Sequence, residues 1–123
     1  MRIIITGEII IQNVEFILDK IKVKVMKKIV VEMTYDADII EVPDEVEKKL
    51  KQIQNKFDEW IHDKETDHKY WHYKDGKKYG PEFRGDAFVE YLNKVILINS
   101  EEKAKVVEMY VENYDPSMKA IWF

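Results

Sequence analysis

The stretch that decides the fold reads Ile29-Val30-Val31-Glu32-Met33-Thr34-Tyr35-Asp36-Ala37-Asp38-Ile39-Ile40-Glu41-Val42-Pro43. Its first half alternates with a period of two, which is typical of a strand with one buried face. One face would carry Ile29, Val31, Met33 and Tyr35, and the other Glu32 and Thr34. Asp36-Ala37-Asp38 then predicts a turn, and Ile39 to Val42 a returning strand that Pro43 ends. Because the connection is short, the two strands are expected to be antiparallel.

A long amphipathic helix is predicted directly after these strands, from Asp44 to about His62. Asp44 and Glu47 have the spacing of a capping box, and Glu45 adds negative charge to the first turn. Apolar residues then recur at helical spacing, namely Val46, Leu50, Ile53, Phe57, Trp60 and Ile61. Charged and amide side chains fill the positions between them, so one face of this helix should pack on the sheet.

A β-hairpin is predicted around Asp75-Gly76, because glycine tolerates the positive φ that a tight turn needs. Asp86 can cap a short helix, with the apolar run 95–98 as its tail or as a buried strand. Ser100 would cap a third helix. Its inner face would consist of Ala104, Val107, Val111 and Tyr114.

The closing segment, Met118 to Phe123, is predicted to be a strand, paired within the sheet or with the edge of another subunit. Strand runs precede mixed helices without βαβ alternation, which favours an α+β fold over α/β. We therefore expect a mostly antiparallel sheet, one long amphipathic helix and two shorter helices. A homo-oligomer is compatible with this sketch.

The bulk composition bounds the class of protein. The chain has 123 residues, which fits one α+β domain over residues 1–123, and its 46% hydrophobic content is that of a globular protein. A net charge of -4 provides no global basic field for nucleic acid. The absence of cysteine excludes disulfides and thiolate chemistry, and it is compatible with the cytoplasm. No apolar run is long enough for a membrane span, and the first residues do not resemble a signal peptide.

The densest recognition chemistry lies between Asp67 and Pro81, with four aromatics, two histidines and four lysines around the Asp75-Gly76 turn. Alternation would place Tyr70 and His72 on a structural face and leave Trp71 and Tyr73 exposed on the other. Tyrosine and tryptophan are enriched at interface hot spots, and lysines suit an acidic partner. The predicted contact residues are Trp71, Tyr73, Lys74, Lys77, Lys78 and Arg84.

Two other functions use the same region. Arg84 beside the aromatics could hold a phosphate, which would make the chain a small-ligand or nucleotide-binding protein that sequesters its ligand. A metal-dependent hydrolase would use His62, Asp67, His68 and His72. On one strand, however, His68 and His72 would lie about 13 Å apart at about 3.3 Å per residue. No nucleotide loop or nucleophile motif occurs, and we expect no catalytic residues, no metal and no cofactor.

In general character the chain resembles the small proteins of bacteriophages and mobile elements, being short, cysteine-free, rich in Lys, Glu and Ile, and without catalytic motifs. Some of those proteins, including anti-CRISPR proteins, counter host defence by binding. The resemblance implies a non-enzymatic binding or inhibitory protein that acts on a host or phage protein. Nucleic acid is a less favoured partner.

A truncated chain beginning at Met26 tests the domain boundary. Met26-Lys27-Lys28-Ile29 has the character of a protein start, so residues 1–25 are predicted to be an extension and 26–123 a self-sufficient domain. The truncated protein should unfold cooperatively in a thermal melt followed by circular dichroism. A truncated protein that fails to fold would mean that residues 1–25 supply integral strands.

Overall fold

The computed structural model describes residues 25–123. The predicted extension, residues 1–25, lies outside the described residues except for Val25. The role of this N-terminal part therefore stays a prediction.

A four-stranded sheet forms one layer of the molecule, in the order β5-β2-β1-β6. Its strands are β1 (Met26–Glu32), β2 (Ala37–Pro43), β5 (Lys105–Val111) and β6 (Lys119–Trp122). The predicted antiparallel pair is confirmed, since β1 pairs with β2, but the turn predicted at Asp36-Ala37-Asp38 lies earlier, at residues 33–36, and Ala37 and Asp38 belong to β2. β5 is antiparallel to β2, whereas β6 is parallel to β1. The sheet is therefore mixed, and the closing strand pairs within it.

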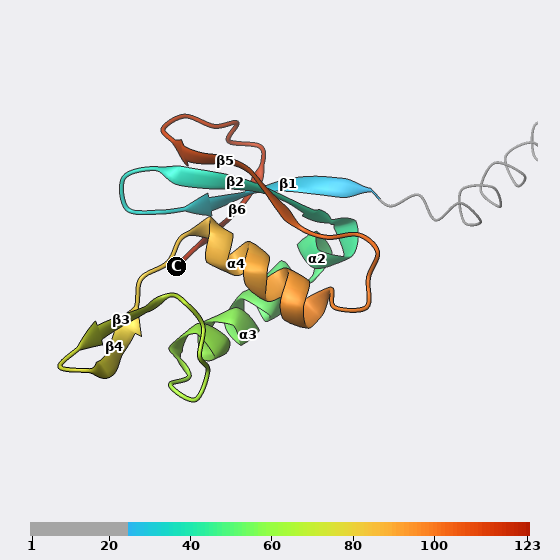
Figure 1. Ribbon diagram of the computed structural model, residues 1–123. Coiled ribbons are helices and arrows are strands. Elements are labelled where there is room, and N and C mark those ends of the chain that lie inside the picture. Colours follow the sequence, from blue (N-terminus) through green and yellow to red (C-terminus); the bar gives the residue numbers. More distant parts are fainter. Residues whose placement is uncertain (1–24) are drawn as a thin grey trace, which may run out of the picture.

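Helices cover one face of this sheet (Figure 1). They are α2 (Asp44–Lys48), α3 (Leu50–His62) and α4 (Gly85–Tyr91), which continues as the π-helical turn η1 (Leu92–Ile96). The π turn confirms that the apolar run after Asp86 is the tail of a helix. Phe57 of α3 lies at the centre of the core, where its ring meets four other aromatic rings at 5.0–5.5 Å: Phe83, Phe88, Tyr91 and Phe123. The prediction of an α+β protein with one long helix is thus confirmed.

The start of the long helix differs from the prediction, although its end at His62 is confirmed. The helix is interrupted at Lys49, so a five-residue α2 precedes the thirteen-residue α3. The predicted capping box is wrong. Pro43 takes the N-cap position, and the Asp44 carboxylate lies 2.9 Å from the Lys48 ammonium instead of accepting a backbone N–H.

The third helix predicted from Ser100 is wrong, because residues 105–111 form strand β5. The register of β5 against β2 shifts twice, so β5 contains extra residues that break a period of two. Its more buried positions are consequently Val106, Met109 and Val111, whereas Val107 of the predicted helical face is exposed. The hydroxyl of Ser100 instead accepts the Glu102 N–H in a local turn.

A buried carboxylate joins β2 to α4 and β5. Asp38 of β2 is completely buried, and it accepts hydrogen bonds from Arg84 Nε and Nη2 at 3.2 and 2.8 Å. It also accepts the backbone N–H groups of Gly85 at 2.8 Å and of Tyr110 at 3.1 Å. The same Nη2 of Arg84 also donates to the Asp36 carboxylate at 2.7 Å. A buried charge with this many donors is stabilised, whereas an unpaired one would be costly.

Backbone geometry at two residues follows from this carboxylate. Tyr110 has a φ of +59°, a left-handed conformation that costs an L-residue about 1–2 kcal/mol. In this conformation the N–H of Tyr110 points at the Asp38 carboxylate and donates to it. A Cβ at Gly85 would lie 2.9 Å from the Cβ of Asp38, so only glycine allows the close approach.

The pKa of Asp38 reflects opposing influences. Burial is the largest and raises the pKa, but the hydrogen bonds from Arg84, Gly85 and Tyr110 and the charge of Arg84 together lower it below its ordinary 3.8. A lowered folded-state pKa means that the carboxylate stabilises the fold above the unfolded-state value. That contribution is lost as the pH falls through the folded-state pKa.

The Asp38→Asn substitution should lower the free energy of unfolding at about pH 7 by about 3–5 kcal/mol, because it leaves Arg84 without its buried charge partner. The difference in free energy of unfolding between the wild type and this variant should stay constant above about pH 5 and become smaller below about pH 4. Urea unfolding over this pH range measures both effects.

The matched control is Asp36→Asn, which removes the partially exposed partner of the same guanidinium. It should cost less than Asp38→Asn, because solvent compensates an exposed charge. Equal losses for the two variants would contradict a special role for the buried carboxylate.

Candidate functional site

The predicted hairpin is confirmed and consists of β3 (Trp71–Lys74) and β4 (Lys77–Pro81), paired antiparallel. Asp75 and Gly76 have φ values of +53° and +74°, as a type I′ turn requires. The two strands form a separate sheet at the end of the molecule, away from the four-stranded sheet (Figure 1). A further hydrogen bond closes the base of the hairpin, where the Glu82 N–H donates to the Tyr70 carbonyl at 2.8 Å.

One face of the hairpin packs on the loop that follows α3. Trp71 is only 7% exposed, and its indole N–H donates to the Thr66 carbonyl at 2.6 Å. Its ring stacks on His68 with centroids 4.7 Å apart. Lys78 lies over the same indole and donates to the Thr66 carbonyl and to the Asp67 carboxylate. Trp71 and Lys78 therefore hold the loop against the hairpin.

The other face of the hairpin is exposed. His72 pairs with Gly80 and Tyr73 with Lys78, so Tyr79 is an extra residue that bulges from β4. Tyr79 is 67% exposed, with the His72 ring at 6.2 Å and the Lys74 ammonium at 5.3 Å from its centroid.

Exposed residues continue to the tip, where Tyr73 is 56% exposed and Lys77 is also exposed. We call the exposed set of His72, Tyr73, Lys74, Lys77 and Tyr79 the hairpin patch. It combines two accessible aromatic rings with two ammonium groups, a composition suited to contact with an acidic surface.

Trp71 and Tyr73 share a face opposite His72, as predicted, but the assignment of the structural face is wrong at Trp71 and His72. Trp71 was expected on the exposed side and is buried, while His72 was expected on the structural side and is exposed. Of the six predicted contact residues, Tyr73, Lys74 and Lys77 are accessible. Trp71, Lys78 and Arg84 are held in contacts within the chain. The contact role of all six stays a prediction, and Tyr79 is the accessible ring that this set omits.

Arg84 does not have the surroundings expected of a phosphate fork. Its guanidinium is bonded to Asp36 and Asp38, and it lies over the ring of Tyr110 at 4.2 Å. The hydrogen bond to Asp38, together with Asp36 and both negative charges, raises the pKa of Arg84 despite partial desolvation. A phosphate would have to compete with two carboxylates at this position.

The residues considered for a metal site have separate partners. His62 Nδ1 lies 2.9 Å from the carbonyl of Asp58, and His72 lies 3.5 Å from the Glu82 carboxylate. His68 Nδ1 accepts the Tyr70 N–H, so its Nε2 carries the proton that is donated to the Ile61 carbonyl. Within residues 25–123, no group of three or more histidines and carboxylates is arranged to hold a metal ion.

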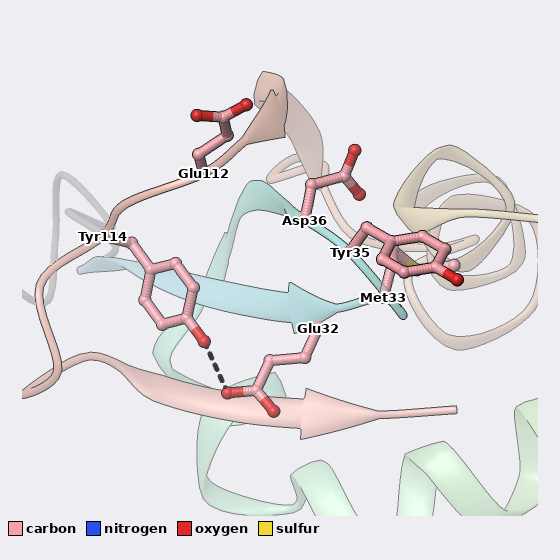
Figure 2. A pocket seen from close by; sticks show the side chains of 6 residues that line it. All are labelled: Glu32, Met33, Tyr35, Asp36, Glu112 and Tyr114. Atoms are coloured by element: carbon pink, nitrogen blue, oxygen red, sulfur yellow. Dashed lines mark hydrogen bonds between the residues drawn. The ribbon is translucent and has the colours of Figure 1, made fainter.

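An acidic hollow of about 230 Å³ lies between the β1–β2 turn and the segment after β5. It is lined by Glu32, Met33, Tyr35, Asp36, Glu112 and Tyr114. Figure 2 shows the Tyr114 hydroxyl donating to Glu32, at 2.7 Å, while Asp36 and Glu112 point away from this pair. Since Asp36 is bonded to Arg84, two of the three carboxylates already have partners. The hollow is not a prepared cation site.

Comparisons with protein-family models, with curated proteins and with solved structures find no match to this chain. No helix in the described part of the chain is both long and apolar enough to cross a membrane.

The difference in burial between Trp71 and Tyr73, two residues of the same face of β3, gives a direct stability test. Trp71→Ala should lower the free energy of unfolding by about 3–5 kcal/mol, because it removes a buried ring and its hydrogen bond. Tyr73→Ala should change it by no more than about 0.5 kcal/mol, since this ring is largely in solvent. Urea unfolding of both variants measures the difference, and a larger loss for Tyr73→Ala would contradict the burial of Trp71 against the loop that follows α3.

Proposed function

We propose that this protein is a non-enzymatic binding or inhibitory protein of the phage or mobile-element type, which acts on a cytoplasmic host protein through the hairpin patch. The observation that carries the proposal is the exposure of Tyr73 and Tyr79 beside Lys74 and Lys77, on a hairpin that Trp71 holds against the loop after α3. Exposed rings on a rigid support lose little conformational entropy on binding.

The chemistry of the patch indicates an acidic partner surface. Lys74 and Lys77 are exposed, and neither forms an ion pair among the described residues. Two tyrosines can supply apolar contact area and hydroxyl donors at the centre of an interface, while surrounding lysines steer an acidic protein toward it. The overall charge of -4 makes this basic hairpin a local feature.

The small-ligand alternative has less support from the geometry. It relies on Arg84 as the phosphate fork beside the hairpin aromatics, and Arg84 is bonded to Asp36 and Asp38. The hydrolase alternative relies on His62, Asp67, His68 and His72, whose ring nitrogens and carboxylate are bonded elsewhere.

The proposal is tested by affinity capture from a host lysate with the double variant Lys74→Glu/Tyr79→Ser. The variant should lose at least about 90% of any partner that the wild type enriches, because it removes a central ring and reverses a charge. Quantitative mass spectrometry of the captured proteins gives the readout.

Lys28→Glu/Tyr35→Ser is the matched control, since both residues are exposed and lie on the β1 side of the molecule. It makes the same chemical changes and should retain the partner. Equal capture by wild type and the hairpin variant, or equal loss in the control, would contradict the proposal.

A further inference from the structure

A groove of about 330 Å³ runs between helix α3 and the edge strand β6, far along the chain from the hairpin. Its floor and walls are formed by Leu50, Lys51, Gln54, Lys119, Ala120, Ile121 and Trp122. Leu50 and Ile121 are buried beneath it, whereas Trp122 is 68% exposed. The groove therefore offers apolar contact below and an accessible indole at its rim.

One side of the groove is the free edge of the sheet. Within residues 25–123, β6 is the last strand in the order β5-β2-β1-β6 and pairs only with β1. The Trp122 carbonyl accepts a hydrogen bond from Gln54 Nε2 at 2.6 Å, so this carbonyl is on the side away from β1. Since backbone groups alternate between the two edges of a strand, the N–H and C=O of Ala120 face the same outer edge.

The lining of the groove is positively charged, which favours an acidic ligand. Lys51 and Lys119 are both exposed, and the lining contains no carboxylate. Lys119 uses one donor on the Glu47 carbonyl at 3.1 Å, which leaves two of its three ammonium protons. Lysines on an edge strand disfavour pairing with a neutral strand, and a second copy would bring its own two lysines to the same place.

We propose that this groove binds an extended acidic peptide segment, which adds to β6 as a further strand. The peptide backbone pairs with the outer edge at Ala120. Its apolar side chains contact the exposed indole of Trp122, and its carboxylates meet Lys51 and Lys119 on the opposite face of the strand. This is strand addition, in which the main chain supplies affinity and the side chains supply specificity. The site does not depend on the function proposed for the hairpin.

The test is a titration of the isotope-labelled full chain with a capped peptide of three Val-Glu repeats. The readout is the position of each backbone amide signal in a two-dimensional NMR spectrum. Signals of residues 50–54 and 119–122 should shift, while those of residues 71–81 should not. A capped peptide of three Val-Lys repeats should bind at least about tenfold more weakly, because it meets two like charges. N-methylation of alternate peptide nitrogens should abolish the shifts if the backbone pairs as a strand.

The variant Lys51→Glu/Lys119→Glu should weaken binding of the Val-Glu peptide by about tenfold. Lys56→Glu/Lys64→Glu changes the net charge equally at exposed positions outside the groove and should leave the affinity unchanged within about twofold. Equal binding of both peptides, or shifts confined to the hairpin, would overturn the proposal. Shifts at residues 119–122 that depend on protein concentration alone would also overturn it, since they would assign this edge to a second copy.

Discussion

The buried carboxylate of Asp38 is the interaction on which the rest of the structure depends. It lies on β2 and gathers hydrogen bonds from Arg84, from the first residue of α4 at Gly85, and from Tyr110 in β5. Three segments that are far apart in the sequence are joined at one side chain. The left-handed Tyr110 and the glycine at position 85 are both explained by this arrangement.

The same interaction fixes the base of the hairpin. β4 ends at Pro81, and only Glu82 and Phe83 separate it from Arg84. Glu82 closes the hairpin onto Tyr70, and the ring of Phe83 packs 5.4 Å from that of Phe57 in the core. The base of the hairpin is thus tied to the core, while β3 and β4 project from the end of the molecule (Figure 1). The tyrosines and lysines of the hairpin patch are exposed there. A fixed base with an exposed tip is a favourable geometry for recognition.

Much of this architecture could be predicted from local patterns. The β1–β2 pair, the helix ending at His62 and the Asp75-Gly76 turn each follow from periodicity or turn chemistry. The predictions that failed have different causes. Extra residues in β5 break the alternation that would have revealed a strand. In the hairpin, Trp71 and His72 do alternate, but the local pattern does not show which face the loop after α3 covers. Arg84 was assigned to a ligand because no sequence pattern shows that a distant Asp38 becomes buried beside it. The exposed Trp122 in a short terminal strand was the available hint of the groove.

The most direct test of the part played by Asp38 is hydrogen exchange at the amide of Tyr110. The side chain of Tyr110 is 63% exposed, and its N–H donates to a side-chain carboxylate at 3.1 Å. If Asp38 joins the three segments, this amide should exchange within about tenfold of the slowest amides of β1 and β2. Exchange as fast as that of the exposed amides that follow β5 would contradict the account.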